Sequence, residues 1–490
     1  MFYKHALAVQ IRRHGRAPAG RTIGVAVFGD RPRRIVTAIA ILAAAMVGGG
    51  MGLAYGQEVS PASGSPPAPE SSSPATAATV ARFAVYGQAT YTEQETNGFD
   101  APYSGPNSLS PGIGRETADA TLYLGARLWR GAELWVNPEV DQGFGLDGTL
   151  GLAGFASGEA YKVGRKAPYF RLQRAFIRQT MDLGGKTAAV DAAPNQLAMQ
   201  RSADRLVLTV GKLSVVDIFD VNRYAHDPRA DFLNWSVIDA GTFDYAADAW
   251  GYSVGGAAEW YTGSWAWRAG VFDLSDVPNS ARLEPGFDEY QSDIEAEHRH
   301  ELLGQPGKVD VTFFESRGRM ALLQEAIAYG EAAGLRPAPD RVRRYRKRDG
   351  MSVDLEQQLT AHVGIFTRLG EAGGNVETYE FTDVDRTLSA GVSVSGGPWH
   401  RPLDTWGVAG AVNALSGDRR RYLAAGGLGI LVGDGKLPHA GHEDILETYY
   451  DLAAAPFLNV TLDYQRVENP AYNRDRGPAS IFAIRVHAAL

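Results

Sequence analysis

The stretch TLYLGARLWRGAELWVNPE, from Thr121 to Glu139, carries the pattern that decides the fold. Apolar residues alternate with polar ones on both sides of a two-residue turn at Arg130–Gly131. The apolar parity comprises Leu122, Leu124, Ala126 and Leu128, then Ala132, Leu134 and Val136. Because side chains of a strand point alternately to the two faces of a sheet, this stretch predicts a β-hairpin with one apolar face.

The same period of two recurs from about Val80 to the end of the chain. Further examples are Val309–Phe313, Val363–Leu369, Leu388–Val394 and Leu458–Tyr464. A soluble β-sandwich also alternates in this way, so the period predicts an all-β protein without fixing its environment.

Three features indicate a membrane. The strands run for about 9–12 residues, the length that a tilted strand needs to cross a bilayer. The face opposite the apolar one is built from small polar residues and scattered charges, as a wet lumen requires. Short turns, at Arg130–Gly131 and Thr262–Gly263, alternate with long connections such as 141–168 and 214–248. Aromatic residues flank both short turns, as in the aromatic girdle of a membrane barrel. They are Trp129, Trp135, Trp260, Tyr261, Trp265 and Trp267.

Strands in a bilayer cannot leave an open edge, so they must close. About 410 residues, at about 25 per strand with its connection, give roughly 16 strands. The fold predicted is therefore a transmembrane antiparallel β-barrel of about 16 strands with long extracellular loops. One stretch, Gly318–Gly334, has helical spacing at Met320, Leu323 and Ile327, and predicts a short loop helix packed on the barrel mouth.

The segment before the barrel reads as targeting sequence. Residues 1–56 combine the basic stretch Arg31–Arg34 with an uncharged apolar run to Leu53 and small residues at Ala54 and Gly56, which predicts a signal peptide. A single transmembrane anchor is the alternative, because 19 apolar residues can span a bilayer. Residues 57–79 are rich in Pro, Ser and Ala and predict a disordered linker. The porin-like domain is then 80–490.

Composition excludes several classes of function. The chain has no cysteine, which rules out disulfides, thiolate metal sites and cysteine nucleophiles. Its formal charge is −8, and without the first 56 residues about −15, which argues against nucleic acid as a partner. His298–Glu301 lacks a zinc spacing, Gly433–Leu437 lacks the rest of a phosphate loop, and no nucleophile elbow occurs. We therefore expect no enzymatic activity, no cofactor and no metal.

Several long stretches resemble the carbohydrate-selective porins of the OprB family. They match in the family's order: 136–164, 210–252, Leu355–Leu359, 424–437, Glu447–Leu452 and 469–478. The resemblance covers roughly Val80 to Leu490. It implies a 16-stranded barrel in the outer membrane of a Gram-negative bacterium that passes monosaccharides such as glucose by facilitated diffusion.

The resemblance also implies partners: small neutral sugars, outer-membrane lipid and lipopolysaccharide, and the barrel assembly machinery, with a homotrimer as one arrangement left open. A general or sugar-acid and anion channel on the same barrel is the first alternative function. An outer-membrane barrel enzyme or adhesin is the second.

The stretch Asp217–Trp235 mixes both charge signs with aromatics, as a site for a neutral polyol requires. We predict a constriction or vestibule from Asp217, Asp220, Arg223, Asp227, Arg229 and Trp235. The alternative is a salt-bridged loop that braces the wall. Further candidates on the inward parity of strands are Glu133, Trp135, Glu139 and Arg485. Arg474 and Arg476 lie at a strand entrance, where they either line the pore or hold a loop by structural pairing.

The final stretch, Ala479–Leu490, alternates like the others. Phe482, Ile484, Val486 and Leu490 are expected to face lipid, and Arg485 and His487 the lumen. Barrel closure is expected to pair this strand with the first one near Arg82–Tyr91. The resemblance implies an aromatic last residue, usually Phe, where this chain has Leu490.

Overall fold

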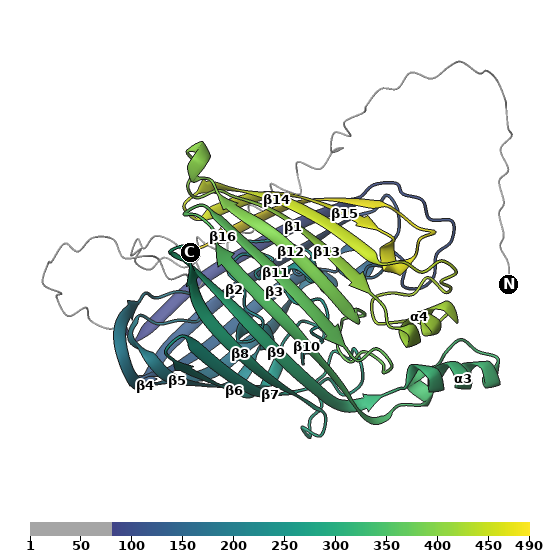
Figure 1. Cartoon of the computed structure of the whole chain (residues 1–490), viewed down its shortest axis with the longest axis horizontal. Helices are drawn as coiled ribbons and strands as arrows, with labels where there is room; N and C mark the ends of the chain where they lie inside the picture. Colours follow the sequence, from purple (N-terminus) through teal and green to yellow (C-terminus); the bar gives the residue numbers. More distant parts are fainter. Residues whose placement is uncertain (1–80) are drawn as a thin grey trace, which may run out of the picture. The chain divides into compact units, whose positions relative to one another are not determined.

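The alternating stretches form sixteen strands in the computed structural model, which describes residues 81–490. Each strand pairs antiparallel with its neighbours in the chain, and β16 closes the barrel on β1 (Figure 1). The predicted all-β class, strand number and closure are confirmed. The predicted signal peptide and linker, 1–79, lie outside the described residues.

The strands are 9 to 26 residues long. Their bounds are β1 (Phe83–Thr96), β2 (Gly114–Trp129), β3 (Ala132–Gly143), β4 (Arg165–Val190), β5 (Met199–Leu213), β6 (Ser253–Thr262), β7 (Trp265–Asp273), β8 (Tyr290–Leu302), β9 (Gln305–Met320), β10 (Arg344–Gln358), β11 (Val363–Ala372), β12 (Arg386–Ser395), β13 (Thr405–Ala414), β14 (Glu443–Ala455), β15 (Leu458–Glu468) and β16 (Ala479–Ala489).

The seam of the barrel lies further along β1 than predicted. Gln88–Thr96 pairs with residues 481–489, whereas the sequence suggested Arg82–Tyr91. The stagger of strands that tilt around a closed barrel shifts this register, which a linear pattern does not reveal. The predicted faces of β16 hold: Phe482 is exposed on the outside and Arg485 is fully buried inside.

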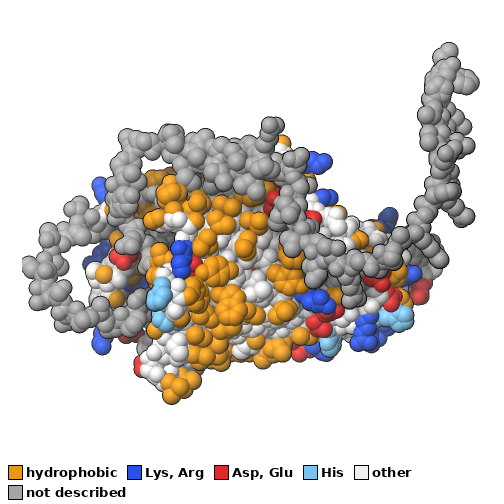
Figure 2. All heavy atoms as spheres, turned by 90° about the horizontal axis from the view of Figure 1, so that it is seen from above, with side chains coloured by type: hydrophobic (Ala, Val, Ile, Leu, Met, Phe, Trp, Pro, Cys, Tyr) orange, Lys and Arg blue, Asp and Glu red, His pale blue; other side chains and the backbone are white. Residues whose placement is uncertain are grey.

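Large apolar side chains cover the outside of the barrel. Figure 2 shows them gathered over the middle of the strands, with charged side chains toward the ends. Of the predicted girdle, four tryptophans lie exposed on this outer face: Trp129, Trp260, Trp265 and Trp267.

Two predicted girdle residues point inward instead. Trp135 is fully buried and Tyr261 packs under Arg205, with the guanidinium 3.5 Å from the ring centroid. Trp135 has the parity of Glu133, which makes it a lumen residue. Gly125, its cross-strand partner, provides the room, because a Cβ there would lie 2.5 Å from the indole.

The two ends of the barrel differ. Short turns join β2 to β3 at Arg130–Gly131 and β6 to β7 at 263–264, one residue later than predicted. Long loops join the strands at the other end, which is the extracellular end in barrels of this kind. Figure 1 shows α3 (Leu323–Ala333) and α4 (Gly417–Ala424) at that end, opposite the C-terminus.

The predicted loop helix is α3, although it begins five residues later than Gly318. Gly318–Met320 continue β9, because their alternation extends the strand past the membrane. Leu323 and Ala326 of α3 pack in one cluster with Tyr422 and Leu423 of α4. None of the helices within residues 81–490 has the length and apolar content needed to cross a membrane.

Candidate functional site in the barrel lumen

Two long loops fold into the barrel and occupy its lumen. One joins β3 to β4 (144–164) and the other joins β5 to β6 (214–252), where it carries the short helix α2 (Trp235–Ile238). We call the second the lumen loop. Its residues 232–249 are buried without interruption. The apolar core of this barrel is therefore the contact of the lumen loop with inward aromatics of the wall, such as Phe366 and Tyr449.

Carboxylates on the inner wall hold the loops by their backbone. Loop N–H groups need acceptors once they leave water. Wall carboxylates accept from them over 2.5 to 3.3 Å: Glu295 from Asp220, Glu356 from Arg223, Glu447 from Leu233 and Asn234, and Glu443 from Ala153 and Gly154. Acidic side chains that point from the wall into the lumen thus determine the path of each loop.

A buried ion cluster binds the lumen loop to β10 and β11. The Arg368 guanidinium lies 3.3 Å from the Asp220 carboxylate and 3.6 Å from Asp354. Asn222 donates to both Asp354 oxygens, at 2.8 and 3.0 Å. A buried ion pair needs such extra hydrogen bonds to offset the loss of water. The start of the lumen loop is therefore rigidly attached to the wall.

Asp217 forms a bidentate pair with Arg174 of β4. Two N–H groups of the guanidinium donate to the two carboxylate oxygens over 2.7 and 2.6 Å. Burial opposes the charged form of Asp217, but Arg174 outweighs it and holds the pKa of this carboxyl below its ordinary value. The pair therefore stays ionised at neutral pH and presents both charge signs.

Arg229 extends toward three carboxylates on the opposite side of the lumen. Its guanidinium lies 3.6 Å from Asp119, 3.9 Å from Glu139 and 3.3 Å from Glu159. Glu139 also accepts hydrogen bonds from Thr121 and Gln173. One cation therefore serves an acidic group contributed by β2, β3 and the loop between β3 and β4.

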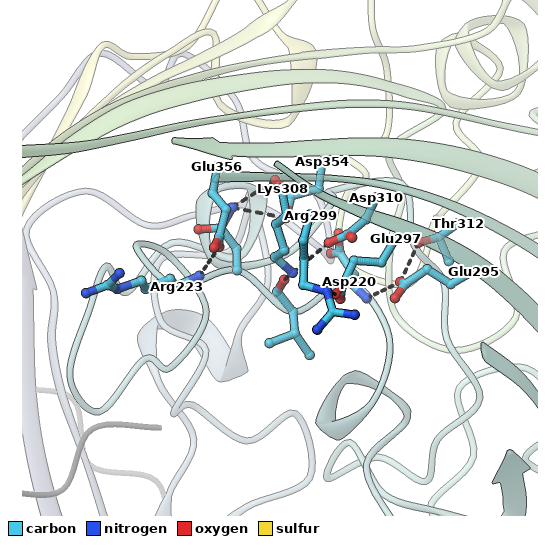
Figure 3. Close-up of polar contacts among 12 residues, drawn as sticks. Asp220, Arg223, Glu295, Glu297, Arg299, Lys308, Asp310, Thr312, Asp354 and Glu356 are labelled. Atoms are coloured by element: carbon cyan, nitrogen blue, oxygen red, sulfur yellow. Dashed lines mark hydrogen bonds and ion pairs between the residues drawn. The ribbon is translucent and has the colours of Figure 1, made fainter. Parts of the chain in front are cut away.

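Between its two buried parts, the lumen loop exposes residues 221–231. Arg223 and Ala230 are exposed, and most of the others are half-buried. Figure 3 shows the Arg223 side chain pointing away from Glu356, whose carboxylate accepts from the Arg223 backbone N–H. Its guanidinium contacts Gln358 at 3.2 Å and lies 5.6 Å from the Tyr224 ring. This segment is the part of the loop that contacts lumen water.

Comparison with known proteins supplies the family. The model of the carbohydrate-selective porins, OprB family, matches residues 108–490. The chain belongs to this family. OprB-family barrels reside in the outer membrane of Gram-negative bacteria, so the predicted location is confirmed. A porin family also agrees with the expectation of a channel and not an enzyme.

Individual relatives are distant. Porin AaxA of Chlamydia muridarum (strain MoPn / Nigg) is 22% identical over 339 residues, which are 66% of this chain and 61% of that protein. The high pH structure of Pseudomonas putida OprB superposes with a TM-score of 0.62 at 15% identity, over 84% of this chain and 94% of that chain. At this level of identity, the likeness shows a shared fold.

The lumen of this OprB-family barrel brings most of the predicted site residues together. Asp217, Asp220, Arg223, Asp227 and Arg229 lie within one loop against the wall. Asp227 accepts from the backbone of Arg229, as expected of a turn. Burial separates the residues of this stretch: Asp220 is buried and braces the loop against the wall, whereas Arg223 is exposed, and the constriction stays a prediction.

Other predicted residues have supporting positions. Trp235 is buried and stacks on Phe155 at 5.4 Å between centroids, so no face remains for a sugar. Trp135 is also closed off and donates to Glu133. Arg485 is fully buried and holds carbonyl oxygens of the lumen loop, those of Pro228 and Asp231.

Two predicted residues lie outside the lumen. Arg474 and Arg476 belong to the extracellular loop between β15 and β16. Arg474 is exposed, whereas Arg476 is buried and donates to loop groups that include the Leu109 carbonyl. Arg476 therefore braces a loop and does not line the strand entrance of a pore.

Sequence reasoning missed the wall residues that receive the lumen loop. They are Arg174, Glu295, Lys308, Asp354, Glu356, Arg368 and Glu447. All lie at inward parity on their strands, and that parity was the signal available. Within residues 81–490 no three His, Asp or Glu side chains are arranged to hold a metal ion.

Proposed function

We propose that this barrel passes small neutral sugars, with monosaccharides such as glucose as the substrate class, by passive diffusion along the exposed segment 221–231 of the lumen loop. Membership of the carbohydrate-selective porins is the observation that carries this proposal. The path needs no cofactor, because the solute crosses without chemical change.

The residues beside this segment suit a polyol. Hydroxyl groups both donate and accept hydrogen bonds, and the segment offers cations and carboxylates side by side, in the Arg174–Asp217 pair and at Arg223 beside Glu356. The half-buried Tyr224 adds an aromatic face against which the apolar side of a sugar ring stacks. Several weak sites in series allow a solute to enter and to leave.

Planar-bilayer recording tests the proposal. We expect the purified protein to form ion-conducting channels whose current falls as glucose is added, because sugar in the lumen displaces ions. Proteoliposomes carrying it should swell faster in glucose than in gluconate. A conductance that ignores sugars would contradict the proposal, and a strongly ion-selective reversal potential would favour the general or anion channel.

Arg223 provides the matched variant. Arg223→Ala removes the exposed guanidinium but keeps the backbone N–H that Glu356 holds, so the loop should stay in place. We expect weaker block by glucose in this variant. Arg115→Ala, at an exposed position at the extracellular end of β2, serves as the control and should leave the block unchanged.

The remaining partner predictions also stay proposals. We expect assembly into the membrane to use the barrel assembly machinery, and native gel electrophoresis of detergent extracts to show whether a homotrimer forms.

A further inference from the structure

A polar patch lies on the outer face of the barrel at the extracellular end of β8–β10. We call it the rim patch and define it as Tyr290, Arg317, Arg319, Tyr345 and Lys347. Each belongs to the outward parity of its strand, which also carries the exposed apolar residues Ile294, Phe313 and Met351. Arg317 and Lys347 therefore lie two outward positions beyond Phe313 and Met351, with Glu315 and Asp349 at the position between them.

Strand pairing places the cations of the rim patch next to one another. Arg317 is the cross-strand partner of Tyr290 on one side and of Lys347 on the other, and Arg319 is the partner of Tyr345. The Arg317 guanidinium lies 5.9 Å from the Tyr290 ring centroid and 4.8 Å from that of Tyr345. Like charges directly opposite on one face of a sheet destabilise it.

Carboxylates neutralise this patch only in part. Lys347 pairs with Glu315 at 2.7 Å. Arg317 donates to the Asp288 carbonyl at 2.6 Å, and across residues 81–490 no carboxylate forms an ion pair with Arg317 or Arg319. On the outward positions at this end of β9 and β10, Arg317, Arg319 and Lys347 outnumber Glu315 and Asp349, although the whole chain has a net charge of −8. The excess of positive charge is local.

We propose that the rim patch binds the phosphate groups of an anionic glycolipid in the outer leaflet. Arginine side chains match phosphate oxygens with two parallel N–H groups, and a phosphate between Arg317 and Arg319 would relieve their repulsion. Tyrosines mark the level of the headgroups in a membrane. Beyond Glu315 and Asp349, the apolar band that begins at Phe313 and Met351 would contact the acyl chains, so a lipid fits this position better than free phosphate does.

Titration of the folded full-length protein in detergent with diphosphoryl lipid A tests this proposal. We expect Arg317→Gln/Arg319→Gln to weaken binding by about thirtyfold, roughly fivefold for each cation at an anionic lipid surface. The matched control is Arg82→Gln/Arg130→Gln, which removes two exposed cations at the opposite end of the barrel and should leave the affinity unchanged.

Dephosphorylated lipid A supplies a second readout that needs no variant. The wild-type protein should bind it at least as weakly as the double variant binds the phosphorylated form. Equal affinity for the phosphorylated and the dephosphorylated lipid would overturn the proposal. Displacement of lipid A by an equal concentration of inorganic phosphate would overturn it as well. Heat-dependent gel mobility shows whether each variant is folded, and Lys347→Gln replaces the double variant if that one is not.

Discussion

Arg485 shows how one wall residue sets the position of the lumen loop. Its guanidinium donates to the Pro228 carbonyl at 2.6 Å and to the Asp231 carbonyl at 2.8 Å, and a third bond to Thr461 fixes its own position. The residues between these carbonyls include Arg229 and the exposed Ala230. A buried cation on the last strand therefore positions the exposed segment.

We predict that Arg485→Met releases this turn and leaves the barrel folded. Two half-buried carbonyls lose a charged donor, which lowers the local free energy of opening by about 2–3 kcal/mol. Amide hydrogen exchange in residues 226–231 should then become roughly 30- to 140-fold faster. Arg466→Met, which removes a half-exposed partner of Glu468 on the outer face, is the control. Unchanged exchange in the loop would show that Arg485 does not anchor it.

The Asp217–Arg174 pair gives a pH-dependent prediction. Because the pKa of Asp217 is lowered in the folded protein, its stabilising effect is complete above the ordinary carboxyl pKa of about 4 and is lost as the pH falls through the lowered value. The difference in unfolding midpoint between wild type and Asp217→Asn should be constant from pH 7 to about 5 and shrink below about 4. A difference that grows on acidification would show that folding does not lower the pKa of Asp217.

At the scale of elements, the lumen loop divides into parts with different roles. Residues 232–249 form a buried plug against the wall, and residues 221–231 contact water. Ala230 and Ala240 illustrate the division, since the first is exposed and the second has no exposed surface. The chain contains no cysteine, so engineered single cysteines report on each part without interference.

We predict that a thiol at position 230 faces the solute path. Ala230→Cys should react with a charged methanethiosulfonate reagent, its channel conductance should fall on reaction, and glucose should slow the reaction by occupying the lumen. Ala240→Cys is the control and should stay unreactive until the barrel is denatured. Equal reactivity of the two thiols would contradict the division of the loop into buried and exposed parts.

At the scale of the whole molecule, the barrel reverses the usual distribution of polarity. Its outer face is apolar, with Leu462 and Phe482 exposed, while Arg348, Arg368 and Arg485 are buried inside. The lipid bilayer takes the place of water as the outer solvent, so apolar exposure on the outer face is stabilising. The buried guanidinium groups of Arg348, Arg368 and Arg485 are each stabilised by a partner in a loop or on the wall.

Leu462→Arg tests this arrangement. Leu462 lies near the middle of β15 and is 60% exposed, and a charge there should cost about 2–4 kcal/mol in a bilayer. Urea unfolding from phospholipid vesicles measures the change. Leu303→Arg, in the turn between β8 and β9 with 91% exposure, should have little effect because that turn lies outside the hydrocarbon region. Equal effects of the two substitutions would contradict the assigned band.

The sequence by itself determined the barrel and the sides of its strands. Period two assigns each side chain to a face, and a bilayer forces closure, so strand number, lipid band and the inward positions of Glu133 and Arg485 all follow from local pattern. Trp135 shows the weight of parity: the sequence left a girdle and a lumen position open, and the structure has the inward position that its parity indicated.

Only the tertiary structure decided which lumen residues meet. The Asp220–Arg368 and Arg229–Asp119 pairs join residues more than a hundred positions apart, and no local period encodes such contacts. The same holds for the seam register, which depends on the stagger of all sixteen strands. Local pattern fixes the direction of a side chain, whereas the path of a long loop depends on where acceptors for its backbone happen to lie in three dimensions.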